Sequence, residues 1–337
     1  MTGIAPFTLH RPTTVADASA LLAQVPGACL VAGGTDLIPN LRRGIGSPHA
    51  LIDLSAIEQF AHIASDAHGW RLGAGVTLAA LLNDAGIAGA LPALHEAAAS
   101  VAGPGHRTVA TLGGNLCLDT RCVFFNQSEW WRRSNAYCLK LGGETCHVAP
   151  QGKRCHAAFS GDVAPALLAL GAQVEVAGIG GTRRLPLAEL YVEDGIRPLT
   201  LAAGELVAAV LVPPQPAGAR SGYRKARIRG AMDFPLAGVA VRASFRDERL
   251  DTLRVALTGV SARPVLLEDA ESLCGQAVDD ALLAALAKRI NRQISPVRTT
   301  VSSAYYRRQV AIVMAQRLLR QLATGEEAPL PGKGKPE

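Results

Sequence analysis

Five of the seven cysteines in this chain lie close together in the sequence, between residues 117 and 155. Cysteine thiolates are soft ligands that suit zinc and iron–sulfur clusters. The residues between these cysteines show no clear helical or strand period. Such a segment lacks the apolar pattern of a core element, so we expect several thiolates to bind a metal centre there. The five are Cys117, Cys122, Cys138, Cys146 and Cys155.

The cysteine spacing does not identify the metal. Between the last four cysteines lie 15, 7 and 8 residues, which matches neither the paired C-x2-C of zinc ribbons nor the common run of bacterial ferredoxins. Four thiolates would suit zinc as well as an iron–sulfur cluster, and the residues alone do not say which four of the five would bind. A redox cofactor nearby would favour iron, because zinc has no redox chemistry.

Two glycine pairs stand at junctions that could bind an anion. VAGGTD at residues 31–36 follows an apolar run, and TLGGN at residues 111–115 repeats a similar order. Glycine lets backbone N–H groups approach a ligand closely, and successive amides can form a nest for a phosphate. Two such loops could bind the two phosphates of one pyrophosphate, although two ordinary tight turns would look the same. Neither is the G-x-G-x-x-G fingerprint, which counts against a Rossmann dinucleotide site.

Short strands and helices surround these motifs and predict an α/β beginning. The expected strands are 29–32, 50–53, 70–73, 173–177, 206–212, 223–228, 236–245 and 253–260. The expected helices are 15–24, 78–84, 91–101, 163–170, 279–290 and 305–323. A cluster of prolines at 213–216 marks a boundary before the last three strands. We therefore expect an N-terminal subdomain at 1–57, a second at 58–217 with an inserted loop at about 118–158, a C-terminal domain at 218–324 and a disordered tail at 325–337.

The composition excludes several classes of protein. With 337 residues, 49% of them hydrophobic, the chain can form more than one core and is too apolar to be disordered. Its apolar runs are shorter than the roughly 20 residues that span a bilayer, and we expect no secretory leader. The net charge of +6 is dispersed in pairs, so we expect neither a nucleic-acid nor a membrane partner. We expect a cytoplasmic protein with reduced thiols.

Four motifs together resemble the FAD-binding subunits of molybdenum hydroxylases, a family that includes xanthine and carbon monoxide dehydrogenases. They are AGGTD at 32–36, TLGGN at 111–115, SGDVAPALLAL at 160–170 and GYRKARIRGAMDFPLAGVAV at 222–241. The resemblance extends from about Phe7 to about Ala323. It implies an oxidoreductase subunit of α+β class, with a two-subdomain FAD-binding fold of the vanillyl-alcohol-oxidase/PCMH type and a C-terminal three-stranded antiparallel sheet with helices.

The cysteine segment resembles an insertion in the beta subunits of 4-hydroxybenzoyl-CoA reductases. The similarity lies in GGNLCLDTRC at 113–122, in NQSEWWR at 126–132 and in the C-x7-C-x8-C run. It implies an additional [4Fe–4S] cluster bound by Cys122, Cys138, Cys146 and Cys155. Cys117 would then be a buried thiol beside the flavin. We expect the remaining two cysteines, Cys29 and Cys274, to be small buried apolar residues.

The same resemblance implies which residues contact FAD. They are Cys29, Leu30, Val31, Ala32, Gly33, Gly34, Thr35, Asp36, Val101, Thr111, Gly113, Gly114, Asn115, Asp162, Val207 and Lys225. In this scheme Asp162 accepts a hydrogen bond from a cofactor hydroxyl, and Lys225 stabilises negative charge on the reduced flavin. Two simpler interpretations stay open: Asp162 could cap the helix that begins at Val163, and Lys225 could be a surface lysine on an edge strand.

The resemblance to the reductase subunits also implies a path for electrons. A reduced ferredoxin-like donor would supply the [4Fe–4S] cluster, and FAD would follow. The electrons would continue to a small subunit with [2Fe–2S] clusters and to a molybdopterin-binding large subunit, where an aromatic CoA thioester would be reductively dehydroxylated. The assembly would be a dimer of heterotrimers, and this chain would supply no catalytic acid, base or nucleophile.

Two other interpretations remain. The first keeps FAD but makes the chain a subunit of a xanthine- or carbon-monoxide-dehydrogenase-type hydroxylase whose insertion holds structural zinc. The second belongs to another class of protein, a zinc-bearing basic scaffold without redox function.

Overall fold

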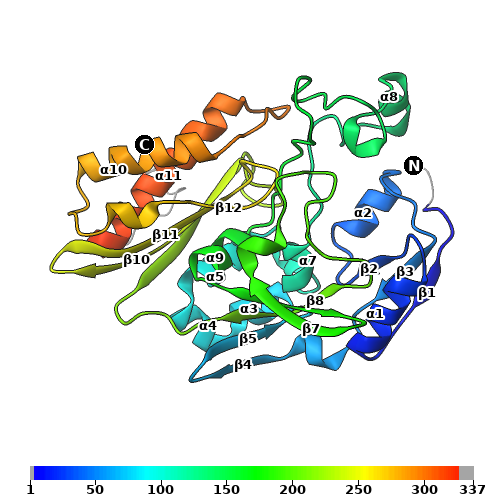
Figure 1. The fold of residues 1–337 in the computed structure, drawn as a ribbon, viewed down its shortest axis with the longest axis horizontal. Helices are drawn as coiled ribbons and strands as arrows, with labels where there is room; N and C mark the ends of the chain where they lie inside the picture. The colour runs from blue at the N-terminus through cyan, green and yellow to red at the C-terminus, as the bar shows by residue number, and fades with distance from the viewer. Residues whose placement is uncertain (1–3, 326–337) are drawn as a thin grey trace, which may run out of the picture.

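The computed structural model describes residues 4–325 and arranges them around three β-sheets (Figure 1). The predicted disordered tail at 325–337 lies outside the described residues, apart from Gly325. The α+β class is confirmed, with two N-terminal sheets followed by a C-terminal sheet that carries helices. Within residues 4–325, no helix is both long enough and apolar enough to cross a membrane.

The N-terminal sheet is small and parallel. Its elements are β1 (Thr8–His10), α1 (Val15–Gln24), β2 (Cys29–Val31), α2 (Leu37–Arg42) and β3 (Ala50–Asp53). The strands pair in the order β1-β3-β2, and both pairings are parallel. Thr14 caps α1, because its side chain accepts a hydrogen bond from the N–H of Asp17. The first glycine loop directly follows β2, so this sheet fixes where the loop begins.

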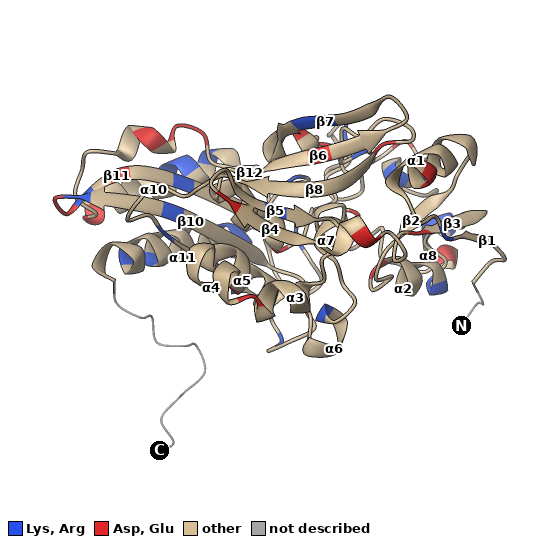
Figure 2. Ribbon diagram, turned by 90° about the horizontal axis from the view of Figure 1, so that it is seen from below, with Lys and Arg blue, Asp and Glu red and all other residues tan. Residues whose placement is uncertain are grey.

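The second subdomain is a five-stranded antiparallel sheet (Figure 2). Its strands are β4 (Ile63–Asp66), β5 (Gly69–Gly73), β6 (Gln173–Gly178), β7 (Gly181–Pro186) and β8 (Leu206–Val212). They pair in the order β4-β5-β8-β6-β7, so β5 from before the cysteine segment lies beside β8 from after it. Strands from before and after the cysteine segment thus form one sheet, and the segment itself adds no strand to it.

Short helices accompany this sheet. They are α3 (Leu78–Asn83), α4 (Ala85–Ala90), α5 (Pro92–Ser100), α6 (Pro104–Arg107), α7 (Leu112–Leu116) and α9 (Val163–Ala169), with 3-10 turns at η1 (Glu58–Ala61) and η3 (Leu187–Leu190). Every residue of α9 is buried, which explains its almost wholly apolar sequence. The start of α9, where the insertion ends, is thus anchored in the main core.

The insertion contains a helix that the sequence analysis does not predict. This helix, α8 (Glu129–Ser134), is capped by Ser128 and followed by the turn η2 (Leu139–Leu141). Six residues are too few to show a helical period. In Figure 1 the insertion forms the green lobe above α2. Two hydrogen bonds join the lobe to the end of α2: Arg132 Nη2 donates to the carbonyl of Gly44 at 3.0 Å, and Arg43 Nη2 donates to that of Asn126 at 2.6 Å.

The C-terminal domain is an antiparallel sheet with two helices packed along it (Figure 1). Its elements are β9 (Arg220–Ala226), β10 (Ala237–Arg246), β11 (Arg249–Thr258), β12 (Val265–Leu266), the turn η4 (Ala270–Leu273), α10 (Asp280–Gln293) and α11 (Ala304–Thr324). The order is β12-β11-β10-β9, so the predicted three-stranded sheet gains a fourth strand of two residues. Lysines and arginines are spread over many elements, as the dispersed charge predicts (Figure 2).

A buried arginine fixes α11 to the loops around it. The Arg307 side chain is 2% exposed and donates hydrogen bonds to the carbonyls of Leu236, Val297 and Gly259. Gly259 in turn donates its N–H to the carbonyl of Phe159, just before α9. Burial lowers the pKa of Arg307 to about 10. This one side chain therefore connects the C-terminal helix to the segment that leads into α9.

Replacing this arginine should destabilise the protein strongly. Arg307→Met leaves three carbonyls, two of them buried, without their charged donor, so we expect the free energy of unfolding to fall by about 3 kcal/mol. Urea unfolding followed by circular dichroism measures the change. Arg317→Met, at an exposed position of the same helix, is the matched control and should shift the free energy by less than about 0.5 kcal/mol. Equal effects of the two substitutions would contradict the assignment.

Candidate cofactor sites

A cavity of about 1290 Å³ lies where the three sheets meet. Every residue that the sequence analysis assigns to FAD lines it. These residues are Cys29, Leu30, Val31, Ala32, Gly33, Gly34, Thr35, Asp36, Val101, Thr111, Gly113, Gly114, Asn115, Asp162, Val207 and Lys225. The fold therefore brings together residues that are almost 200 positions apart in the sequence, and the volume suits a large organic cofactor.

The two glycine loops are packed so closely that side chains would not fit. A Cβ atom on Gly33 would lie 1.9 Å from the carbonyl oxygen of Val109, and one on Gly113 would lie 2.8 Å from the Cβ of Ala74. Thr111 caps the second loop by accepting a hydrogen bond from the N–H of Gly114 at 3.1 Å. Glycine is thus required by packing as well as by the approach of a ligand. Both loops line the same cavity, as two halves of one phosphate site would.

An ion pair is buried in the wall of this cavity. Lys225 Nζ donates to Asp162 Oδ2 at 2.8 Å, and the two side chains are 3% and 4% exposed. The hydroxyl of Tyr223 donates to the other carboxylate oxygen at 2.6 Å. Burial raises the pKa of Asp162, while Lys225 and Tyr223 act in the opposite direction. Lys225 is on edge strand β9 but is not a surface lysine, so the simpler interpretation of this residue is wrong.

The helix cap at α9 comes from a different residue than the simpler interpretation expects. Asp162 stands at the N-cap position, yet its side chain makes no capping hydrogen bond. Asn115 does so instead, because its Oδ1 accepts from the N–H of Val163 at 3.1 Å. Asp162 is consequently free to bind Lys225 and to face the cavity. The same Asn115 contact holds together the two chain positions that flank the insertion.

The C-terminal end of α5 completes the surroundings of the ion pair. The carbonyl of Ser100 accepts a second hydrogen bond from Lys225 Nζ at 3.1 Å. Glu96 accepts hydrogen bonds from the N–H of Tyr223 at 2.6 Å and from Arg224 at 2.9 Å. Sequence reasoning missed Tyr223 and Glu96. Alternation along a strand could have identified Tyr223, since it lies two residues before Lys225 and so on the same face of β9.

The four cysteines assigned to a cluster converge on a second, small cavity. Cys122, Cys138, Cys146 and Cys155 all line it. The N–H of Phe125 donates to the sulfur of Cys122, and the N–H of Ala157 donates to that of Cys155, each at 3.4 Å. Backbone N–H groups directed at sulfur are a feature of iron–sulfur sites. Among residues 4–325, no group of three or more His, Cys, Asp or Glu side chains is arranged closely enough to hold a metal ion.

The other cysteines are elsewhere. Cys117 lines the large cavity rather than the small one, and burial raises the pKa of its thiol to about 12. A thiol in that state is protonated and packs as an apolar group. Cys29 also lines the large cavity, and Cys274 packs against the C-terminal core. Both are only partly buried, so the prediction that they are small buried apolar residues holds only in part.

Two residues line both cavities and therefore form the wall between them. Phe125 is 4% exposed, and the Lys140 side chain is 8% exposed. Both border the large cavity and the small one, and the ammonium group of Lys140 lies 4.8 Å from the centre of the Phe125 ring. Burial raises the pKa of Cys155 to about 11, and Lys140 acts against this rise. The wall thus contains one aromatic ring and one cation.

The first glycine loop also contacts the insertion through an arginine. Arg121 Nη2 lies 3.7 Å from Asp36 Oδ2, which makes an ion pair but not a hydrogen bond. Its Nη1 donates to the side chain of Asn126 at 3.1 Å. Burial lowers the pKa of Arg121, while Asp36 and Asp119 raise it. The insertion therefore contributes a charged side chain to the lining of the large cavity.

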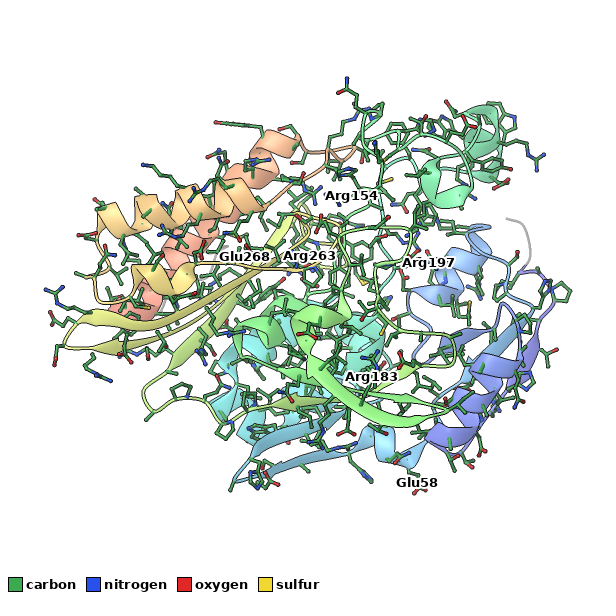
Figure 3. The ribbon with its side chains drawn as sticks, viewed as in Figure 1. Glu58, Arg154, Arg183, Arg197, Arg263 and Glu268 are labelled. Carbon is green, nitrogen blue, oxygen red and sulfur yellow. The ribbon has the colours of Figure 1, made fainter. Side chains whose placement is uncertain are left out.

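The base of the insertion is fixed to the C-terminal domain by a shared carboxylate. Arg154 Nη1 lies 3.0 Å from Glu193 Oε1, and Arg263 Nε lies 3.2 Å from Glu193 Oε2. Figure 3 shows Arg154 and Arg263 between the lobe and the C-terminal sheet. The backbone also closes here, through an isolated bridge between Arg121 and Ala158. Both ends of the insertion are thus held at its root.

Two protein families match this chain along nearly its whole length. Residues 5–215 match the FAD binding domain in molybdopterin dehydrogenase, and residues 221–322 match the CO dehydrogenase flavoprotein C-terminal domain. Both matches include parts of the large cavity, the first through the glycine loops and the second through β9.

Individual relatives and a solved structure are similar to the chain over the same residues. The aldehyde oxidoreductase FAD-binding subunit PaoB of Escherichia coli (strain K12) is 35% identical over 290 residues, covering 82% of this chain and 90% of that protein. The carbon monoxide dehydrogenase medium chain of Afipia carboxidovorans is 29% identical over 320 residues, covering 94% and 96%. The solved structure of reconstituted CO dehydrogenase from Oligotropha carboxidovorans has a TM-score of 0.80 at 25% identity, covering 96% and 99%. The chain is therefore an FAD-binding oxidoreductase subunit that belongs to the molybdenum hydroxylase family, with the medium chains of xanthine and carbon monoxide dehydrogenases.

Proposed function

We propose that this chain transfers electrons between FAD and a [4Fe–4S] cluster inside a molybdenum hydroxylase. Its partners would be a molybdopterin-binding large subunit and a small subunit with [2Fe–2S] clusters. One observation carries the proposal: the four cysteines line one small cavity, and Phe125 and Lys140 separate that cavity from the large one. Two redox groups in cavities that share two lining side chains could exchange electrons directly.

Four thiolates suit a cluster as well as a zinc ion, and the neighbouring flavin cavity favours the cluster because zinc has no redox chemistry. A cluster places each thiolate on its own iron and does not need the sulfurs to meet at one point. Gly195 leaves room for the ligand, because a Cβ there would lie 2.8 Å from the sulfur of Cys155.

The named relatives favour a hydroxylase over the reductive dehydroxylation expected from the cysteine pattern. They include subunits of an aldehyde oxidoreductase and of carbon monoxide dehydrogenase. We therefore propose that the large subunit oxidises an aldehyde, and that electrons leave through FAD and the cluster. A 4-hydroxybenzoyl-CoA reductase with a ferredoxin-like donor is the second candidate, supported by the cysteine spacing and the GGNLCLDTRC sequence at 113–122.

The cluster assignment predicts opposite behaviour of two cysteines. Cys146→Ser should remove most of the cluster iron and its low-temperature EPR signal, because it deletes one of four ligands. Cys117→Ser is the matched control, since this cysteine lines the flavin cavity, and should keep about four iron atoms per FAD beyond those of the small subunit. Metal analysis and EPR of the reduced complex measure both. Zinc without this iron in the wild-type protein would reject the cluster.

The role of Lys225 predicts a change in the flavin potential. Lys225→Met removes a buried cation from the cavity wall, so the reduced, anionic flavin should become harder to form. We expect the two-electron midpoint potential to fall by roughly 30 mV or more, which corresponds to about 1.4 kcal/mol. Spectroelectrochemical titration at the flavin absorbance measures it. Lys225→Arg and the exposed Lys288→Met are controls, and an unchanged potential in Lys225→Met would refute the electrostatic role.

The two candidate reactions predict different responses of the purified complex. If the enzyme is a hydroxylase, anaerobic addition of an aromatic aldehyde should bleach the flavin, because electrons reach FAD from the large subunit. A dithionite-reduced complex should then remain reduced when 4-hydroxybenzoyl-CoA is added. The reverse pattern would favour the reductase. Rapid-scan absorbance measures both reactions, and mass spectrometry of the co-purified subunits identifies the assembly.

A further inference from the structure

We propose that Lys140 raises the reduction potential of the centre held by the four cysteines. It would do so through its buried positive charge, which lies in the wall between that centre and FAD. This inference rests on the proposed function, because it takes the centre to be an iron–sulfur cluster. Lys140 lines both cavities. It would be a positioning residue that acts through its charge, without a part in the chemistry of the substrate.

The ammonium group of Lys140 is fixed in one place. It donates to Asp119 Oδ1 at 2.6 Å, to the carbonyl of Thr120 at 2.9 Å and to the Thr120 hydroxyl at 2.7 Å. These three contacts use all three donors of an ammonium group. Thr120 is itself buried, and its hydroxyl donates to the carbonyl of Gly195 at 2.8 Å. The charge therefore cannot move away from the wall without breaking several buried hydrogen bonds.

The ion pair between Lys140 and Asp119 is unequal in its exposure to solvent. The lysine side chain is 8% exposed, whereas the aspartate side chain is 42% exposed. Water screens the aspartate, and the lysine lies in a region of lower dielectric constant where charges interact more strongly. Asp119 lines the large cavity but not the small one, so the pair leaves a net positive field on the side of the four cysteines. The Phe125 ring, 4.8 Å from the ammonium group, adds apolar surface that excludes water from this wall.

A fixed positive charge favours the reduced form of a nearby redox centre. Reduction adds one electron to the cluster and makes it more negative, so Lys140 would stabilise the product of that step. The step is the transfer of one electron from reduced FAD to the oxidised cluster, and no bond forms or breaks between the two groups. Lys140 would thus draw the electron toward the four cysteines and away from FAD.

Two substitutions of opposite sign test this inference in the complete complex. Lys140→Met removes the cation, and we expect at least a tenfold shift of the electron away from the cluster, a fall of 59 mV in its one-electron midpoint potential. Asp119→Asn removes the screened anion and should raise that potential. Lys140→Arg retains the charge, and Lys153→Met removes an exposed lysine of the same insertion; both should stay close to wild type. Redox titration followed by the cluster EPR signal measures all four.

The outcomes separate this inference from the proposed function. Absence of cluster iron in the wild-type complex would reject the cluster itself. Lys140→Met could instead keep its full iron content and share the electron between FAD and cluster in a ratio within twofold of the wild-type ratio. That result would reject the role of Lys140 and leave the cluster in place. A merely structural lysine would give shifts of the same sign in Lys140→Met and Asp119→Asn. Should Lys140→Met lose its iron, the Asp119→Asn shift decides, and an unchanged or lower potential there rejects the inference.

Discussion

The buried ion pair between Asp162 and Lys225 is the interaction on which the flavin cavity depends. Asp162 precedes a helix that is wholly buried in the second subdomain, and Lys225 belongs to a strand of the C-terminal domain. Burying two charges is costly unless hydrogen bonds satisfy them. Here Tyr223 and the carbonyl of Ser100 supply those bonds. The two domains can therefore close the cavity only in the arrangement that brings all four groups together.

A constraint on the other side of the cavity explains how the chain accommodates its insertion. Asn115 caps the N–H of Val163, and Arg121 pairs with Ala158 through the backbone. The entropy cost of a loop rises only slowly with its length when its ends are held together. About forty residues can thus be added between the second glycine loop and α9 without disturbing either. The insertion can pack around its own thiols. It is further stabilised by the hydrogen bond from Arg132 to Gly44 after α2 and by the ion pair between Arg154 and Glu193.

The sequence predicted the flavin site better than the cluster site, for physical reasons. Glycines at 33 and 113 are dictated by backbone contacts that exclude any side chain, so they mark their loops even in a single sequence. The role of Asp162 could not be decided from the sequence, because its position directly before α9 fits a helix cap. Asn115, which lies 47 positions earlier in the sequence, caps the helix instead. Such a long-range replacement leaves no local pattern. The choice of four cysteines from five is of the same kind, since spacing does not reveal that Cys117 points into the other cavity.

The wall between the cavities links these two sites in one electrostatic scheme. FAD and the proposed cluster both become more negative on reduction, and adjacent negative charges repel. Lys225 and Lys140 are each nearly removed from solvent, at 3% and 8% exposure, and each is fixed by a carboxylate. Lys225 borders only the large cavity, whereas Lys140 borders both. Lys225 would therefore favour reduction of FAD, whereas Lys140 would favour reduction of the cluster over that of FAD, because its partner Asp119 lines the large cavity and not the small one.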